Sequence, residues 1–146
     1  MRRIVNRVPY ATVIFPDRCM MPTLYSIVEL GGYPDFGPEY RRSGFQVVSV
    51  PSVRKALALM KKDPPDVVVA EFNFQSDFRD RSSNLETLMA ILQKLPQVKL
   101  LVFYMPDHAD RFDKFRAAHP VDAAIAFPIT ADKVRTILGG GTFLRE

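Results

Sequence analysis

Hydrophobic residues along this chain gather into short runs that are separated by longer amphipathic or polar segments. Several of the runs are rich in β-branched residues and nearly continuous, rather than alternating with polar residues. This pattern is typical of strands that are buried on both faces, as in a parallel sheet covered by helices. It predicts five strands, at residues 11–15, 45–50, 67–70, 100–104 and 123–127.

The segments between the predicted strands carry apolar residues at helical spacing, preceded by residues that cap helices. Ser52 can cap a helix that continues to about residue 62, Asp107 one that continues to about residue 118, and Thr130 the last one. Leucines and a methionine in 85–95 predict a further helix, which Ser82 or Ser83 can cap. The pattern therefore places a helix after each of the later strands.

The segment between the first two predicted strands is read differently. Residues 23–30 follow Pro22 and are predicted to be helical. Residues 31–44 are rich in glycine and proline and are predicted to form a loop insertion, because neither residue type favours the interior of a helix or strand. Its aromatic residues Tyr33, Phe36 and Tyr40 are expected to pack the loop onto the body of the protein.

This order of elements predicts an α/β fold, a doubly wound five-stranded parallel sheet with helices on both faces. The 146 residues suit a single domain, with a core of about 11–138 and a flexible tail at 139–146. In sheets of this kind the functional site lies at the carboxyl ends of the strands. The candidate site residues are therefore those at or just after the end of each strand.

Composition narrows the class of protein. The single cysteine excludes an internal disulfide, and no apolar run approaches the ~20 residues that span a bilayer, so we expect a cytoplasmic protein without membrane contact. The formal charge is +4, but the basic residues form isolated pairs rather than a stripe with interleaved aromatic residues. Nucleic acid is therefore not the expected partner.

Two segments resemble the receiver domains of bacterial response regulators. The run from Ser52 to Glu71, which ends in PPDVVVAE, is similar to the second helix and third strand of that family, where PDVVLLD ends in the aspartate that accepts a phosphoryl group. The run VDAAIAFPI, from Val121 to Ile129, is similar to the segment of the fifth strand. The resemblance covers residues 11–138 and implies a flavodoxin-like, CheY-like fold.

The same resemblance implies that the phosphorylation site is degenerate. The phosphoacceptor position holds Glu71, the Thr or Ser position after the fourth strand holds Tyr104, and the Lys before Pro128 is replaced by Phe127. Of the acidic pair that holds Mg²⁺ after the first strand, the alignment leaves only Asp17. Because phosphoryl transfer needs the charge on the phosphoryl oxygens neutralised, we expect no phosphorylation, no metal and no cofactor.

The expected function is that of a pseudo-receiver, which is not an enzyme and acts by docking. Its partner is another signalling protein or a second copy of the chain, bound through about residues 107–138. The loop after the third strand, with Arg79, Asp80 and Arg81, is a further recognition candidate against a simple solvated loop. Two alternatives stay open: a weak phospho-accepting regulator with Mg²⁺ at Asp17 and Glu71, and a small domain that binds a nucleotide or flavin.

Overall fold

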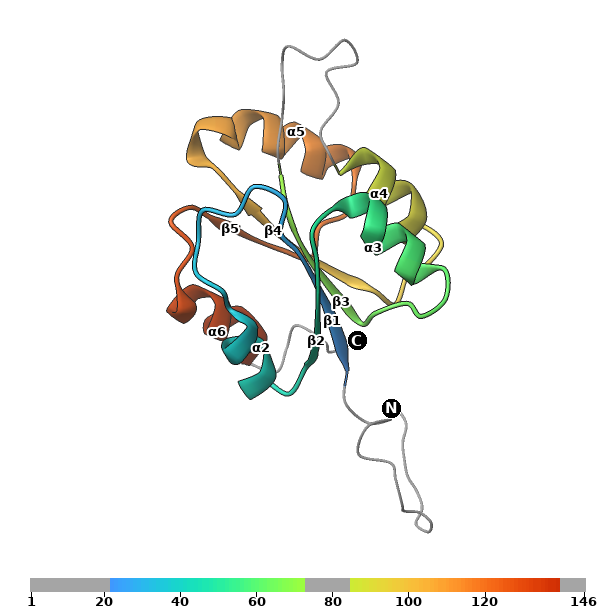
Figure 1. Cartoon of the computed structure of the whole chain (residues 1–146). Helices are drawn as coiled ribbons and strands as arrows, with labels where there is room; N and C mark the ends of the chain where they lie inside the picture. The colour runs from blue at the N-terminus through green and yellow to red at the C-terminus, as the bar shows by residue number, and fades with distance from the viewer. Residues whose placement is uncertain (1–21, 73–84, 140–146) are drawn as a thin grey trace.

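The computed structural model describes residues 22–72 and 85–139, which form one sheet and the helices around it (Figure 1). All pairings in the five-stranded sheet are parallel, in the order β2-β1-β3-β4-β5. The strands are β1 (Thr23–Ile27), β2 (Gln46–Val50), β3 (Val67–Glu71), β4 (Lys99–Tyr104) and β5 (Ala123–Ala126). The predicted parallel α/β fold is confirmed.

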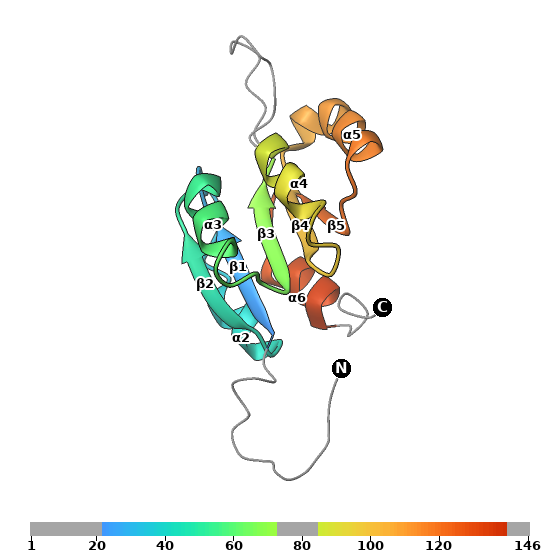
Figure 2. The same ribbon diagram turned by 90° about the vertical axis from the view of Figure 1, so that its right-hand side faces the viewer.

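Helices cover both faces of this sheet. Helices α3 (Val53–Met60), α4 (Glu86–Leu92) and α5 (Ala109–Ala118) lie on one face, and α2 (Gly37–Arg42) and α6 (Ala131–Gly139) lie on the other (Figure 1). A 3-10 turn, η2 (Pro106–His108), leads into α5. Viewed from the side in Figure 2, α3 lies over β1 and β2, and α4 lies over β3 and β4.

The central strand β3 supplies side chains to the core on each face of the sheet. Side chains of a strand point alternately to opposite faces, so a fully buried strand must be apolar at every position. In β3, Val68 and Ala70 pack beneath α3, α4 and α5, whereas Val67 and Val69 pack against α2 and α6. The nearly continuous run VVVA therefore follows from the sheet being covered twice.

Two aspartate side chains accept hydrogen bonds at the edge of the sheet where the strands begin. Asp66 Oδ2 accepts a hydrogen bond from the backbone amide of Thr23 at 2.8 Å, which ties the start of β3 to the start of β1. Asp122 Oδ2 accepts one from the amide of Leu100 at 2.8 Å, between β5 and β4. Each acid satisfies a donor that has no strand partner at the edge. Asp66 thus lies at the end of the sheet opposite to Glu71.

Of the predicted caps, Ser52 and Thr130 are confirmed, whereas Asp107 is wrong, because α5 begins after His108 and no side chain caps it. Ser52 Oγ accepts a hydrogen bond from the amide of Lys55 at 3.2 Å, and Thr130 Oγ1 accepts one from Lys133 at the same distance. Both bonds use a free amide of the first helical turn. Ser82 and Ser83, the candidate caps of α4, lie outside the described residues.

Two predictions about the amino-terminal third are wrong. Residues 23–27, predicted to be helical, form the interior strand β1, because their β propensity and burial between β2 and β3 outweigh the helix signal after Pro22. Residues 37–42, predicted to be loop, form α2, in whose first turn Pro38 is tolerated because no amide donor is needed there. The segment 11–15, predicted as the first strand, lies outside the described residues.

The aromatic residues of the 31–44 segment do pack onto the body. Phe36 and Tyr40 are buried in the core between the sheet and helices α2 and α6, and Tyr33 is half-buried beside them. Gly44, with φ of +100°, ends the turn that leads from α2 into β2. Among the described residues, no helix is long and apolar enough to cross a bilayer.

Candidate functional site at the carboxyl edge of the sheet

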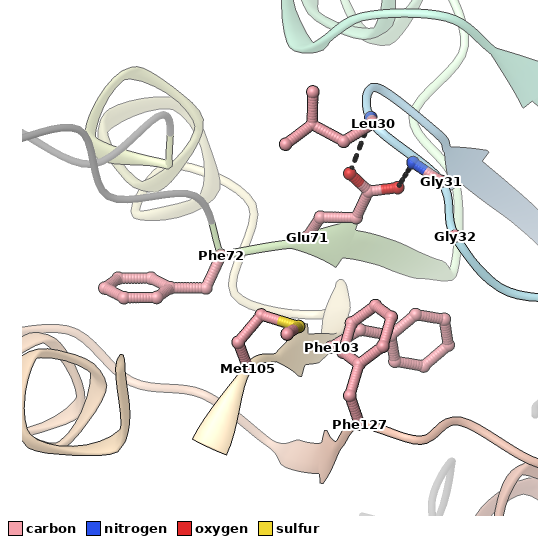
Figure 3. Close-up of a pocket in the computed structure, with 8 residues that line it drawn as sticks. All are labelled: Leu30, Gly31, Gly32, Glu71, Phe72, Phe103, Met105 and Phe127. Atoms are coloured by element: carbon pink, nitrogen blue, oxygen red, sulfur yellow. Dashed lines mark hydrogen bonds between the residues drawn. The ribbon is translucent and has the colours of Figure 1, made fainter. Parts of the chain in front are cut away.

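The carboxylate of Glu71 lies at the carboxyl edge of the sheet, at the end of β3, with only 4% of the residue exposed. Its Oε1 accepts a hydrogen bond from the backbone amide of Leu30 at 2.9 Å. Its Oε2 accepts two more, from the amide of Gly31 at 3.1 Å and from the hydroxyl of Tyr33 at 2.5 Å. Figure 3 shows the side chain turned toward the backbone of the β1–α2 loop.

The loop that receives this carboxylate is shaped by two glycines. Gly31 and Gly32 have φ of +74° and +88°, in the left-handed region that glycine adopts without strain. Successive amides in such a turn point to one side and form a small anion-binding concavity. Here the anion is internal: Glu71, one methylene longer than aspartate, reaches from β3 to the loop that follows the neighbouring strand β1.

Tyr33 sits at the centre of an aromatic cluster above the sheet. Its ring makes edge contacts with Phe103 and Phe127, at centroid distances of 5.1 and 5.8 Å, and it stacks on Phe36 at 6.1 Å. Burial, and then the hydrogen bond and charge of Glu71, raise the pKa of the Tyr33 hydroxyl well above its ordinary value. The neutral hydroxyl is thus kept as a donor to the carboxylate.

The acid after the first strand of the sheet is Glu29, not Asp17. Because β1 ends at Ile27, the residues that follow it are Val28 and Glu29, so the alignment that assigned this position to Asp17 is wrong. Glu29 Oε2 accepts a hydrogen bond from the amide of Val53 at 3.0 Å and so caps the start of α3. Asp17 lies outside the described residues.

Tyr104 and Phe127, at the ends of the adjacent strands β4 and β5, belong to different cores. Tyr104, at the end of β4, stacks on Phe112 of α5 with ring centroids 4.5 Å apart, in the core beneath α3, α4 and α5. Phe127, directly after β5, belongs to the opposite core with Tyr33. The two side chains therefore leave the sheet on opposite faces.

A pocket of about 290 Å³ opens at this edge beside Glu71 (Figure 3). Residues from the ends of four strands line it: Leu30, Gly31, Gly32, Glu71, Phe72, Phe103, Met105 and Phe127. Apart from the Glu71 carboxylate, the lining side chains are aliphatic, aromatic or a thioether. No lysine, arginine, serine or threonine is among these residues.

Lys133, a lysine close in sequence to the end of β5, bonds to backbone carbonyls and is not among the pocket residues. Lys133 of α6 donates from Nζ to the carbonyl oxygen of Pro128 at 2.8 Å and, more weakly, to that of Ala126 at 3.4 Å. Pro128 itself is exposed and follows Phe127 through a cis peptide bond. In the two described segments, no group of three or more His, Cys, Asp or Glu residues is arranged to hold a metal ion.

Four residues of this edge were not predicted as site residues: Glu29, Leu30, Gly31 and Tyr33. The cause was the misplaced first strand, which moved the strand end from residue 27 to residue 15. The signal was available in the sequence, since TLYSIVEL is followed at once by a Gly-Gly pair, as expected for a buried strand that ends in a tight turn. The recognition candidates Arg79, Asp80 and Arg81 lie outside the described residues.

Comparison with known proteins gives structural matches only. No protein-family model and no curated protein sequence matches the chain. Among solved structures, a response regulator receiver domain from Clostridium thermocellum is 13% identical, with a TM-score of 0.64 over 86% of this chain and 94% of that one. A response regulator from Thermotoga maritima is 14% identical, with a TM-score of 0.65 over 87% of this chain and 100% of that one.

A longer protein matches over one part. NtrX from Brucella abortus is 16% identical, with a TM-score of 0.66 over 86% of this chain and 27% of that one. At such identities the comparisons establish the fold. The chain has the flavodoxin-like fold of response regulator receiver domains, as the sequence motifs predicted.

Proposed function

We propose that this protein is a receiver-like interaction module that works without phosphorylation, by docking to another signalling protein or to a second copy of itself. The observation that carries the proposal is the state of Glu71. The side chain at the phosphoacceptor position is buried, and both of its oxygens accept hydrogen bonds from the β1–α2 loop.

A carboxylate in this state is a poor nucleophile for a phosphoryl group. Attack would require an oxygen of Glu71 to leave its amide or hydroxyl donors and turn into a pocket whose described lining residues include no lysine, arginine or hydroxyl side chain. Phosphoryl transfer depends on cations and donors that neutralise the equatorial oxygens. The amides of Leu30 and Gly31, the donors closest to such a role, are already bound to Glu71.

The same reasoning disfavours the two alternatives. A Mg²⁺ site would need carboxylate oxygens at this edge, but Glu71 accepts donors from the loop and Glu29 caps α3. A nucleotide or flavin needs a phosphate cradle, and the amides that resemble one are filled by the protein's own carboxylate. The pocket is also at the lower limit of the ~300–1,000 Å³ that small-molecule sites occupy.

Treatment with acetyl phosphate or with beryllofluoride, each with Mg²⁺, tests the phosphorylation-independent part of the proposal. We expect no added phosphate in the intact mass and no change in the amide spectrum of Leu30, Gly31 or Phe72. A phosphorylatable receiver domain treated in parallel is the positive control. Stoichiometric labelling at Glu71 would contradict the proposal.

The docking face proposed for the partner comprises residues 107–138, that is α5, β5 and α6 with their connections. β5 is an edge strand, so these two helices flank one side of the sheet on opposite faces. The exposed surface of α5 mixes acids and bases at Asp110, Arg111, Asp113, Lys114 and Arg116. Mixed charge suits a reversible, polar protein interface better than a nucleic acid.

Charge reversal on this face tests the location. Sedimentation velocity of the wild type over a range of concentrations measures self-association, and Lys114→Glu is expected to weaken it while Lys61→Glu, beyond the end of α3, leaves it unchanged. If the wild type stays monomeric, the docking partner is a different protein. Cross-linking of that partner to the same two variants then compares the two faces. Equal effects of the two substitutions would contradict the assigned face.

A further inference from the structure

Exposed apolar side chains concentrate at one edge of the described molecule. Four large hydrophobic residues in the described segments are strongly exposed, namely Val28, Leu30, Leu59 and Met105. Three of them follow the carboxyl ends of β1 and β4, and Leu30, at 72% exposed, and Met105, at 42%, form part of the pocket beside Glu71. Apolar surface around the mouth of a hollow marks a binding site more often than scattered exposed residues do.

Bare backbone forms one wall of this hollow. Gly31 and Gly32 add no side chains, and a Cβ placed on Gly32 would lie 3.9 Å from Cε2 of Phe127. That contact distance shows how close the loop comes to the Phe127 ring. Any larger residue at position 32 would extend into the space beside this ring. The space is therefore kept open by the same glycines that shape the loop around Glu71.

The negative charge of the residues that line the pocket disfavours an anionic ligand. Glu71 is the single ionisable side chain among the described residues of the lining, and none of these residues carries a positive charge to offset it. Its oxygens bind donors of the loop, so the surface left for a ligand is made chiefly of aromatic and aliphatic groups. Phe103 and Phe127 supply rings, and Met105 supplies a flexible, polarisable thioether that adapts to aromatic partners.

We propose that this pocket is a binding site for a small, uncharged, aromatic molecule. The volume limits the ligand to about one fused bicyclic ring system, since drug-sized ligands fill sites of ~300–1,000 Å³. The site lies at the carboxyl ends of the neighbouring strands β1 and β3. Strand β1 is followed in the chain by β2 on one side, and β3 is followed by β4 on the other, so the chain connections after β1 and β3 run to opposite sides of this point. Ligands of doubly wound sheets bind at such switch points.

Ligand binding at this pocket is independent of the proposed docking through residues 107–138. The experiment below can therefore support or overturn the pocket proposal whatever the outcome for docking. Indole is the probe, because the sequence contains no tryptophan, and excitation beyond the tyrosine band reads the probe's fluorescence alone. A second readout is the ¹³C-methyl spectrum of the methionines. We expect the Met105 methyl to shift in a saturable manner through ring currents, while the buried Met60 and Met89 methyls stay in place.

Substitutions and a charged analogue complete the test. Met105→Glu is expected to weaken indole binding at least tenfold, and Leu59→Glu, at a matched 38% exposure on α3, is expected to leave it unchanged. Indole-3-carboxylate is expected to bind at least tenfold more weakly than indole to the wild type. If Met105→Glu does not fold, Leu30→Glu at the same mouth replaces it.

The proposal is overturned by any of three results. These are a linear shift that does not saturate, equal affinities of the mouth variant and Leu59→Glu, and equal affinities for indole and its carboxylate. The first would mean weak partitioning onto apolar surface, and the other two would mean that the probe binds outside this pocket.

Discussion

The hydroxyl of Tyr33 and the carboxylate of Glu71 lie 2.5 Å apart, although the two residues are 38 positions apart in the chain. Together with the amides of Leu30 and Gly31, this bond fixes the β1–α2 loop to the end of β3. The position that resembles a phosphoacceptor therefore holds a structural carboxylate. Hydrogen bonds to a charged group of this kind typically contribute ~1.5–3 kcal/mol each.

The first prediction concerns the charge of Glu71. Glu71→Gln keeps the size of the side chain but replaces one acceptor oxygen by an NH₂ group, which then faces an amide or hydroxyl donor. We expect the free energy of unfolding to fall by ~1–3 kcal/mol, because a buried donor is left without an acceptor. Urea denaturation measures the loss. Asp107→Asn, an exposed acid on the same edge, is the control and is expected to change stability little.

The second prediction is that the loop keeps its anion site when Glu71 is shortened. Glu71→Ala leaves the amides of Leu30 and Gly31 and the Tyr33 hydroxyl facing an empty space the size of a small carboxylate. We expect acetate to raise the melting temperature of this variant by mass action, and not that of the wild type. Thermal melts in acetate and in chloride of equal ionic strength measure the difference. Equal effects of the two salts would show that the loop collapses when the carboxylate is removed.

The third prediction concerns alkaline pH. Burial raises the pKa values of Tyr25, Tyr33 and Tyr40 above the ordinary value of 10, with the Glu71 hydrogen bond adding to the effect at Tyr33. A raised folded-state pKa stabilises the neutral form, so this contribution is complete below pH 10 and is lost as the pH rises through the folded-state values. Titration of tyrosinate absorbance should show fewer than the five tyrosines of the sequence ionising near pH 10.

Tyr33→Phe separates the Tyr33 contribution from the others. The variant keeps the ring contacts with Phe103 and Phe127 and loses only the hydroxyl, so we expect a cost of ~1–3 kcal/mol near neutral pH. Stability of the variant should fall less steeply above pH 10 than that of the wild type. Parallel curves for the two proteins would show that Tyr33 does not contribute to the alkaline loss.

The fourth prediction assigns Glu29 a structural role. Its carboxylate accepts the amide of Val53, so Glu29→Ala removes a cap and a favourable charge at the start of α3. We expect a loss of ~0.5–2 kcal/mol, similar to that of Ser52→Ala, which removes the second cap of the same helix. Chemical denaturation of both variants measures the losses. Mg²⁺ at millimolar concentration should leave the stability of the wild type unchanged, and a marked increase would contradict the role as a cap.

The opposite edge of the sheet offers a fifth test. Asp66→Ala leaves the amide of Thr23 without its acceptor at the amino end of β1. We expect a loss of ~0.5–1.5 kcal/mol, because the bond is exposed and water can replace the lost acceptor. Hydrogen exchange of the Thr23 amide should accelerate in the variant, while exchange of the Leu30 and Gly31 amides at the other edge stays as in the wild type.

The sequence by itself determined the layers of the fold. Runs such as VVVA in β3 and LLVF in β4 are apolar at successive positions because both faces of the sheet are covered, and this property can be read from one chain without its partners. The caps Ser52 and Thr130 are also local, since each side chain bonds an amide three residues away. The replacement of Lys by Phe127 before Pro128 was likewise visible at once.

Only the tertiary structure decided which strand is first and what Glu71 does. The choice of residues 23–27 for β1 depends on hydrogen bonds to β2 and β3, which are formed by residues far away in the chain. The partners of Glu71 come from a loop about forty positions earlier, and no local pattern connects them. The opposite directions of Tyr104 and Phe127 follow from their positions on adjacent strands, where the pleat of the sheet assigns each side chain to one face.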